Sequence, residues 1–226
     1  MSTLQDFIKW NEEKWEEKNQ EMYTSKNDKN IWPWFSKELD LDVITFLKAN
    51  STDSGKILDL GTCSGAQAIA LANMGYDVVG TDVSHTALSK AISITKTLPK
   101  DIKLNFIIDD ILNTKLVEEQ FDLILDRGCF HSICCISTKK YIENLNTLLK
   151  PNGKIILKTM SLKENRFISF DTFAGQRIPM PYRFDEEIIR NIFTDHFTIN
   201  TIEDSYFYSS VVSPPAKAML TILTKK

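Results

Sequence analysis

The sequence predicts an α/β fold in which a mostly parallel sheet carries helices on both faces. Short apolar runs with the length and composition of buried parallel strands occur at five places: 57–60, 77–80, 104–108, 121–125 and 154–159. Segments long enough for connecting helices separate most of these runs. Near the end of the chain, 197–203 and 217–224 have the pattern of an antiparallel hairpin, and a helix is predicted from Phe184 through Phe193.

Residues 1–50 are predicted to form a helical cover over this sheet. Leu4, Phe7, Ile8 and Trp15 recur at helical spacing, and a second helix is predicted around Leu39 to Leu47. The segment is rich in tryptophan, with Trp10, Trp15, Trp32 and Trp34. These side chains either pack on the exposed end of the sheet or form a lid over a site, and the sequence leaves both interpretations open.

Length and composition limit the remaining possibilities. A chain of 226 residues has the size of one α/β domain, so 1–226 is predicted to be a single domain. The net charge is -3 and basic residues are scattered, which argues against a nucleic-acid partner. The sequence shows neither a long apolar stretch nor a leader, so we expect no membrane partner and a cytoplasmic location. The four cysteines lack C-x-x-C spacing, so neither disulfides nor a metal site is predicted, and the oligomeric state is left open.

The segment 56–84 carries the most informative pattern. Asp59 and Gly61 end the first predicted strand, Gly65 opens an alanine-rich helix, and Asp82 ends the next strand. The two glycines allow a sharp turn and leave room for a ligand, while Asp82 lies where a ribose diol would bind. Because the turn lacks the G-x-G-x-x-G pattern that a pyrophosphate requires, a dinucleotide is disfavoured.

This turn resembles motif I of the class I S-adenosylmethionine-dependent methyltransferases, (D/E)-x-G-x-G-x-G, with Cys63 at the central glycine. Further landmarks in the family's order are 109–111, 126–131 and 149–153, the last as a turn before the fifth strand. The resemblance covers about 30–226. It implies a Rossmann-like, seven-stranded sheet ending in an antiparallel hairpin, with S-adenosyl-L-methionine as cofactor and S-adenosyl-L-homocysteine as product. The aromatic N-terminal region is similar to that of the thiopurine, thiol and tellurite-resistance methyltransferases, where it covers the cofactor.

The resemblance also implies a set of cofactor-binding residues. In it, Asp59 organises the turn, Asp82 binds the ribose and Asp110 accepts from the adenine amino group. Cys63 is small enough to let the amino-acid end of the cofactor approach. The complete predicted set is Asp59, Gly61, Thr62, Cys63, Gly65, Asp82, Val83, Asp110, Ile111 and Trp34.

Asp126 and His131 are the candidate catalytic residues, because they follow the fourth strand at the edge where open sheets bind ligands. An unperturbed histidine has a pKa near 6.5, so His131 is a candidate general base. The alternatives are that His131 caps a helix and that Asp126 and Arg127 orient the loop. Cys129 has no neighbouring base in the sequence and is predicted to be structural.

The function predicted from these features is methyl transfer to a small-molecule acceptor, such as a thiol or another soft nucleophile. The aromatic-rich segment 161–183 is the predicted substrate-facing insertion. Two alternatives stay open. The segment 126–131 resembles the Asp-Lys-Gly-Thr-x-Asp segment of protein lysine methyltransferases, although His131 replaces the final acid, and Cys63 in the glycine turn is compatible with a cofactor-binding protein without catalysis.

Overall fold

The computed structural model describes residues 3–24, 35–50, 55–99, 101–209 and 212–226, and for 134–136 it describes the backbone only. Five parallel strands form the body of the sheet: β1 (Lys56–Leu60), β2 (Asp77–Asp82), β3 (Leu104–Ile108), β4 (Phe121–Arg127) and β5 (Leu149–Ser161). The antiparallel pair β9 (Phe197–Phe207) and β10 (Ala216–Lys225) follows. The order β3-β2-β1-β4-β5-β10-β9 confirms the predicted seven-stranded sheet, to which the short β8 (Arg183–Phe184) is added beside β5.

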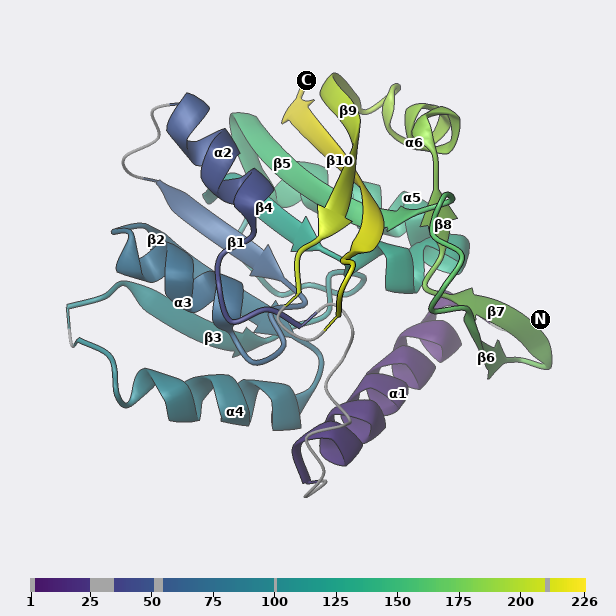
Figure 1. Cartoon of the computed structure of the whole chain (residues 1–226), viewed down its shortest axis with the longest axis horizontal. Coiled ribbons are helices and arrows are strands. Elements are labelled where there is room, and N and C mark those ends of the chain that lie inside the picture. Colours follow the sequence, from purple (N-terminus) through teal and green to yellow (C-terminus); the bar gives the residue numbers. More distant parts are fainter. Residues whose placement is uncertain (1–2, 25–34, 51–54, 100, 210–211) are drawn as a thin grey trace.

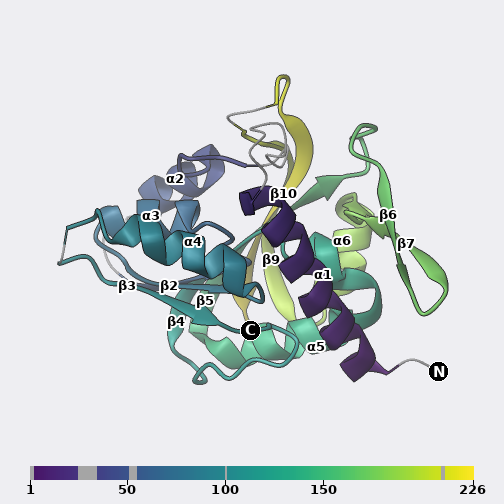
Figure 2. The ribbon, with the colours of Figure 1, turned by 90° about the horizontal axis from the view of Figure 1, so that it is seen from below.

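Helices cover both faces of this sheet (Figures 1 and 2). One face carries α2 (Leu41–Ala49), α3 (Ala66–Asn73) and α4 (His85–Thr95), and the other carries α5 (Phe130–Leu148) and α6 (Glu186–Phe193). The core divides in the same way. Leu58 of β1 packs in the cluster that contains α5 and α6, whereas its neighbour Ile57 packs in the cluster with α2 and α3. This alternation follows from the opposite direction of successive side chains along a strand.

The first helix, α1 (Leu4–Thr24), crosses the end of the sheet at which β1 and β4 point (Figures 1 and 2). It lies between α4 and a hairpin formed by β6 (Ser169–Phe173) and β7 (Gln176–Met180). Phe7 meets Phe173 edge to face at 5.3 Å, and Lys18 Nζ lies 3.0 Å from an Asp171 oxygen. The segment 161–183, predicted as a substrate-facing insertion, therefore packs against α1 through its β6–β7 hairpin.

The predicted turn at 149–153 is instead the beginning of β5. Leu149 already pairs with Phe121, and the register shifts before Leu123 pairs with Lys154. Between these pairs β5 has more residues than β4, and one of them, Asn152, has φ +61°. Asparagine tolerates this left-handed conformation better than most residues. The strand thus begins with an irregular pair where a separate loop was expected.

Within the described ranges, the structure has no helix that combines the length and the apolar character needed to cross a membrane. The cytoplasmic location and the single domain over 1–226 stay predictions.

Candidate active site

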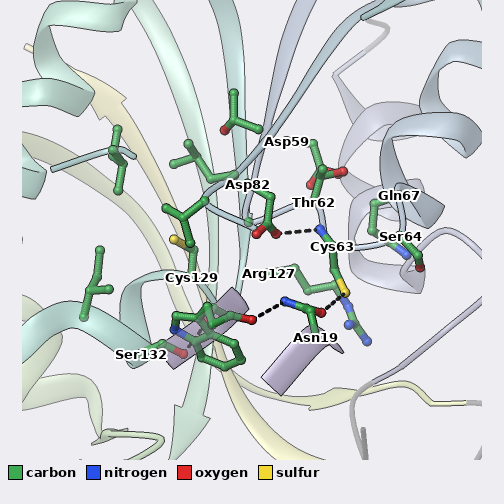
Figure 3. Close-up of a pocket in the computed structure, with 18 of the residues that line it drawn as sticks. Asn19, Asp59, Thr62, Cys63, Ser64, Gln67, Asp82, Arg127, Cys129 and Ser132 are labelled. Atoms are coloured by element: carbon green, nitrogen blue, oxygen red, sulfur yellow. Dashed lines mark hydrogen bonds between the residues drawn. The ribbon is translucent and has the colours of Figure 1, made fainter. Parts of the chain in front are cut away.

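A cavity lies at the carboxyl ends of β1 to β4, with α1 along one side (Figure 3). This is the edge at which parallel sheets bind ligands, because the loops that follow the strands converge there. The structure places nine of the sequence-predicted residues on its wall: Asp59, Gly61, Thr62, Cys63, Asp82, Val83, Asp110, Ile111 and His131. Trp34 lies outside the described residues, while Gly65 and Asp126 lie behind the wall.

The turn after β1 is held in a defined conformation. Gly61 and Cys63 both have positive φ, +63° and +53°. The Thr62 backbone N–H donates to the Thr81 carbonyl oxygen at 2.8 Å, and its hydroxyl donates to Asp59 Oδ2 at 2.5 Å. Burial raises the pKa of Asp59 to about 7. The backbone of the turn therefore faces the cavity, and the hydrogen bond from Thr62 to Asp59 holds the turn in place.

Gly65 has a different role from the ligand-facing one predicted for it. It precedes α3 with φ +79°, and a Cβ added there would lie 2.5 Å from Phe106 Cζ and 3.0 Å from Ala91 Cβ. Phe106 on β3 thus occupies the space that a side chain would need. Glycine is required at this position for the backbone conformation and for the contact between the turn and the sheet.

Asp82 connects two of the loops that surround the cavity. Its Oδ2 accepts from the Cys63 backbone N–H and its Oδ1 from the Ser84 backbone N–H, both at 2.9 Å (Figure 3 draws the first). Burial raises the pKa of Asp82. A carboxylate has about four acceptor positions, so Asp82 retains capacity for further donors such as hydroxyl groups.

Unpartnered acceptors gather at the β3 end of the cavity. Asp110 Oδ1 accepts from the Leu112 N–H at 2.8 Å, but Asp110 Oδ2, Asp109 Oδ2 and Asn11 Oδ1 are buried without a hydrogen-bond partner in the described structure. Burial raises the pKa of Asp110 to about 6. Because a buried acceptor without a donor is costly, this end of the cavity fits a ligand that carries hydrogen-bond donors.

Asp126 does not line the cavity. It is completely buried, and its Oδ1 accepts from the backbone N–H groups of Gly128 and Cys129 at 3.0 and 2.8 Å. Its Oδ2 accepts from Phe130 N–H at 2.9 Å and from the Tyr141 hydroxyl at 2.7 Å. Burial raises the pKa of Asp126 to about 6. These contacts fit the alternative interpretation, in which Asp126 orients the loop, better than the predicted catalytic role.

His131 lies at the cavity, but its contacts differ from those expected of a general base. Its Nδ1 accepts from the Met160 backbone N–H at 3.1 Å, and its ring lies 5.5 Å from that of Phe207. Burial, together with the nearby charge of Arg127, lowers the pKa of His131 to about 3. The imidazole is therefore neutral across the physiological pH range.

Arg127 contributes the cationic part of the wall and belongs to a buried network of charges. Its Nε donates to Asp40 Oδ2 and its terminal nitrogen to the Tyr208 carbonyl, both at 2.8 Å. Lys158 Nζ donates to the other Asp40 oxygen at 2.5 Å. Since Asp40 also caps α2, this network ties α2 to β4, β5 and the end of β9.

The helix α1 supplies functional side chains that the sequence reasoning missed, namely Asn11 and Asn19, which line the cavity with Trp15. Asn11, Trp15 and Asn19 follow one another at intervals of four and so share one helix face. The two asparagines were missed because only the apolar residues of that face were considered. The helix is attached to the turn after β1 at Cys63, whose sulfur lies 3.1 Å from Tyr23 Oη. The same sulfur lies 3.8 Å from Asn19 Oδ1 (Figure 3).

A second attachment of α1 is made by Glu16 at the amino terminus of α4. Its carboxylate accepts from the hydroxyls of Ser84 and Thr86 at 2.7 and 2.6 Å, and from the Thr86 N–H at 3.2 Å. Burial alone would raise the pKa of Glu16, but these hydrogen bonds lower it to about 2. The described part of the N-terminal segment thus lies along the cavity, and its role as a cover over a cofactor stays a prediction.

Together these features define a class: an α/β enzyme with a cofactor site at the carboxyl edge of a parallel sheet, a glycine turn after β1 and acidic residues after β2 and β3. The family profile described as a methyltransferase domain matches residues 51–193. The chain belongs to this family, and it is a class I S-adenosylmethionine-dependent methyltransferase.

Individual relatives are consistent with this assignment. An uncharacterised methyltransferase of Schizosaccharomyces pombe is 34% identical over 105 residues, which cover 46% of this chain and 71% of the relative. EEF1A lysine methyltransferase 2 of Danio rerio is 28% identical, covering 60% and 61% of the two chains, and thiocyanate methyltransferase 1 of Arabidopsis thaliana is 29% identical, covering 57% and 56%.

The fold also matches solved structures. A 1,6-didemethyltoxoflavin-N1-methyltransferase of Burkholderia thailandensis, solved with S-adenosylhomocysteine, superposes with a TM-score of 0.69 at 16% identity, over 100% of this chain and 92% of that one. At this identity the likeness concerns the fold, so the residues that bind ligands in the present chain are argued from its own geometry.

Proposed function

We propose that the cavity binds S-adenosylmethionine with its adenine near Asp110 and Ile111, its ribose at Asp82 and its amino-acid end at the turn Gly61 to Ser64, and that the methyl group passes to a small-molecule acceptor. The observation that carries the proposal is the unpartnered Asp110 Oδ2, buried in the cavity wall. An adenine amino group is a donor that would satisfy it.

The charges of the wall support this cofactor over a dinucleotide. Four aspartates, Asp59, Asp82, Asp109 and Asp110, line the cavity. Carboxylates repel a pyrophosphate and attract the sulfonium and ammonium groups of adenosylmethionine. Asp82, at the end of β2, keeps free acceptor positions for the two ribose hydroxyls.

When bound, adenosylmethionine supplies a methyl group on an electron-poor sulfonium. The protein chiefly has to position an acceptor in line with that group and exclude water. Asp126 contributes as a positioning residue, because it fixes the backbone from Gly128 to Phe130. Of these residues, Gly128 and Cys129 line the side of the cavity that we assign to the acceptor. Trp15 and Asn19 of α1 line the same cavity.

The small-molecule acceptor is supported by the similarity to thiocyanate methyltransferases. The test is turnover with adenosylmethionine on a panel of small thiols, phenols and amines, measured as S-adenosylhomocysteine release. We expect methylation of at least one thiol. Failure on the whole panel by a preparation that binds S-adenosylhomocysteine would contradict the small-molecule acceptor.

A protein lysine acceptor is the second candidate, favoured by the similarity to EEF1A lysine methyltransferase 2. Mass spectrometry of a methyl-depleted lysate, incubated with the enzyme and isotope-labelled adenosylmethionine, would then reveal a discrete polypeptide with a methylated lysine. Label confined to low-molecular-weight compounds would favour the small-molecule acceptor instead.

A further inference from the structure

We propose that His131 is a hydrogen-bond donor to the methyl acceptor, and that this acceptor enters the site as a soft nucleophile that is already ionised, a small thiolate or comparable anion. The inference rests on the proposed function, because it names the acceptor class of that same site. It replaces the general base predicted from the sequence by a group that orients the nucleophile without taking its proton.

The tautomer of His131 follows from its hydrogen bonds. Nδ1 accepts from the Met160 backbone N–H at 3.1 Å, so this nitrogen carries no proton. In a neutral imidazole the proton must then lie on Nε2, which becomes a donor. Among the residues that the structure describes, none accepts from Nε2. The backbone is fixed too, since the His131 carbonyl oxygen accepts from the Tyr182 N–H at 2.8 Å.

The Nε2 edge of the ring is open to the cavity because the neighbouring residue is glycine. Gly128 lines the cavity with φ +106°, and a Cβ added to it would lie 3.0 Å from both Nε2 and Cε1 of His131. Any side chain at this position would cover the ring. The N–H of His131 therefore lies on the acceptor side of the wall, near Arg127 and Ser132.

The surroundings keep this imidazole neutral and favour an anion beside it. Phe207 and Met160 contact the ring from β9 and β5, and the charged group that acts on it is Arg127 of β4. The Arg127 guanidinium lies 5.2 Å from the centre of the Phe207 ring, on which His131 also packs. Although Arg127 is paired with Asp40, its guanidinium lies on the cavity wall, where its positive charge opposes protonation of the histidine and favours a bound anion over a cation.

This arrangement decides which nucleophiles can react. A lone pair of the acceptor sulfur forms the new S–C bond, while the C–S bond of the sulfonium breaks and its electron pair remains on that sulfur. A thiolate completes this exchange without losing a proton, whereas an alcohol must first give one to a base. Burial raises the pKa values of Cys63 and Cys129 on the wall, so these thiols are protonated and provide no base. In this proposal the aspartates of the wall hold the turn after β1 and the cofactor, so they do not serve the acceptor.

The test compares two variants of the full-length enzyme. His131→Gln keeps an N–H donor and cannot act as a base at neutral pH, whereas His131→Leu keeps neither function. With 4-nitrothiophenol as acceptor, we expect kcat/KM to fall less than about 5-fold in His131→Gln and about 10-fold or more in His131→Leu, as for a lost hydrogen bond to a charged group. Equal losses in both variants would show that the N–H donor is not what His131 contributes and would overturn the proposal.

Two further results separate this inference from the proposed function. If phenol is methylated as well as the thiol, the ionised-acceptor class is wrong although the methyltransferase assignment stands. If no thiol, phenol or amine reacts, the small-molecule function fails and the inference fails with it. Thermal unfolding of both variants shows whether each is folded at the assay temperature.

A measurement on the unmodified enzyme does not depend on turnover. The chain has three histidines, so 15N NMR signals of the His131 ring can be assigned by their loss in His131→Gln. With S-adenosylhomocysteine bound, we expect a neutral ring protonated on Nε2 and no titration between pH 5.5 and 8.5. A proton on Nδ1, or titration within this range, would contradict the donor role.

Discussion

Replacing Gly65 by alanine separates a packing role for this residue from a ligand-binding role. Two costs follow from the structure. A left-handed φ of +79° costs an alanine about 1–2 kcal/mol. The new Cβ would also lie 2.5 Å from Phe106 Cζ and 3.0 Å from Ala91 Cβ, and overpacking of this kind costs about 1–3 kcal/mol. We therefore expect Gly65→Ala to lower the free energy of unfolding by about 2–5 kcal/mol.

Gly75→Ala is the matched control. Gly75 ends the same helix with φ +98°, but no described atom lies within 4 Å of a Cβ added there. This variant bears the conformational cost without the contact, about 1–2 kcal/mol. Combining Gly65→Ala with Phe106→Leu should recover part of the loss, since the substitution removes the ring that the Cβ meets.

Urea unfolding followed by circular dichroism gives the free energy of unfolding of the four proteins: the unmodified chain, Gly65→Ala, Gly75→Ala and the double variant. Equal destabilisation by Gly65→Ala and Gly75→Ala would refute the contact with Phe106 as the reason for glycine at position 65. A Gly65→Ala protein of unchanged stability that no longer binds S-adenosylhomocysteine would restore the ligand-facing role predicted from the sequence.

Three further predictions concern the contacts that hold the site together. Glu16→Gln should destabilise the protein by about 1 kcal/mol at pH 7, because the carboxylate caps the amino terminus of α4. The folded pKa of Glu16 is about 2, below its ordinary value of 4.5, so the stabilisation is complete above pH 4.5 and disappears as the pH falls towards 2. Urea unfolding of the unmodified protein and Glu16→Gln should therefore show a smaller difference in stability at pH 3 than at pH 7. Asp126→Asn should lower the free energy of unfolding by about 2–3 kcal/mol, because it disturbs all the donors to the carboxylate. Tyr141→Phe removes one of these donors and should lower it by about 1 kcal/mol. Thermal unfolding that gives the reverse order would contradict the positioning role of Asp126. Lys158→Met should cost about 3–5 kcal/mol by leaving buried carboxylate charge, chiefly on Asp40, without this partner, and a loss below about 1 kcal/mol in urea unfolding would show that the network is unimportant.

The strands and the cofactor edge could be predicted because their signals are local. A short apolar run that ends in glycine or aspartate, as at Asp59 and Asp82, identifies both a buried strand and the edge at which it ends. The helix α5 was not placed, because its first turns contain cysteine, serine and threonine, which are weak helix formers. Its start is fixed by Asp126, which accepts from the backbone N–H groups of 128–130 at the point where the helix begins.

The properties of individual side chains depend on contacts that are distant in sequence. The tautomer of His131 is set by Met160, 29 residues further along the chain, and the need for glycine at position 65 by Phe106. Asn11 was overlooked because its polarity acquires meaning only when α1 lies against the cavity. Residue pattern located the site, whereas tertiary packing determines what each residue in it can do.

The most direct test of the cofactor site is calorimetric titration of the unmodified protein and Asp110→Asn with S-adenosylhomocysteine and with its inosine analogue, in which a carbonyl replaces the adenine amino group. Asp110→Asn retains the acceptor for Leu112 N–H and exchanges the unpartnered oxygen for a donor. The account predicts that the unmodified protein prefers the adenine compound by about 10-fold or more, and that the variant loses or reverses this preference. The same preference in both proteins would contradict the placement of the adenine at Asp110, and no binding of either compound would contradict the cofactor site itself.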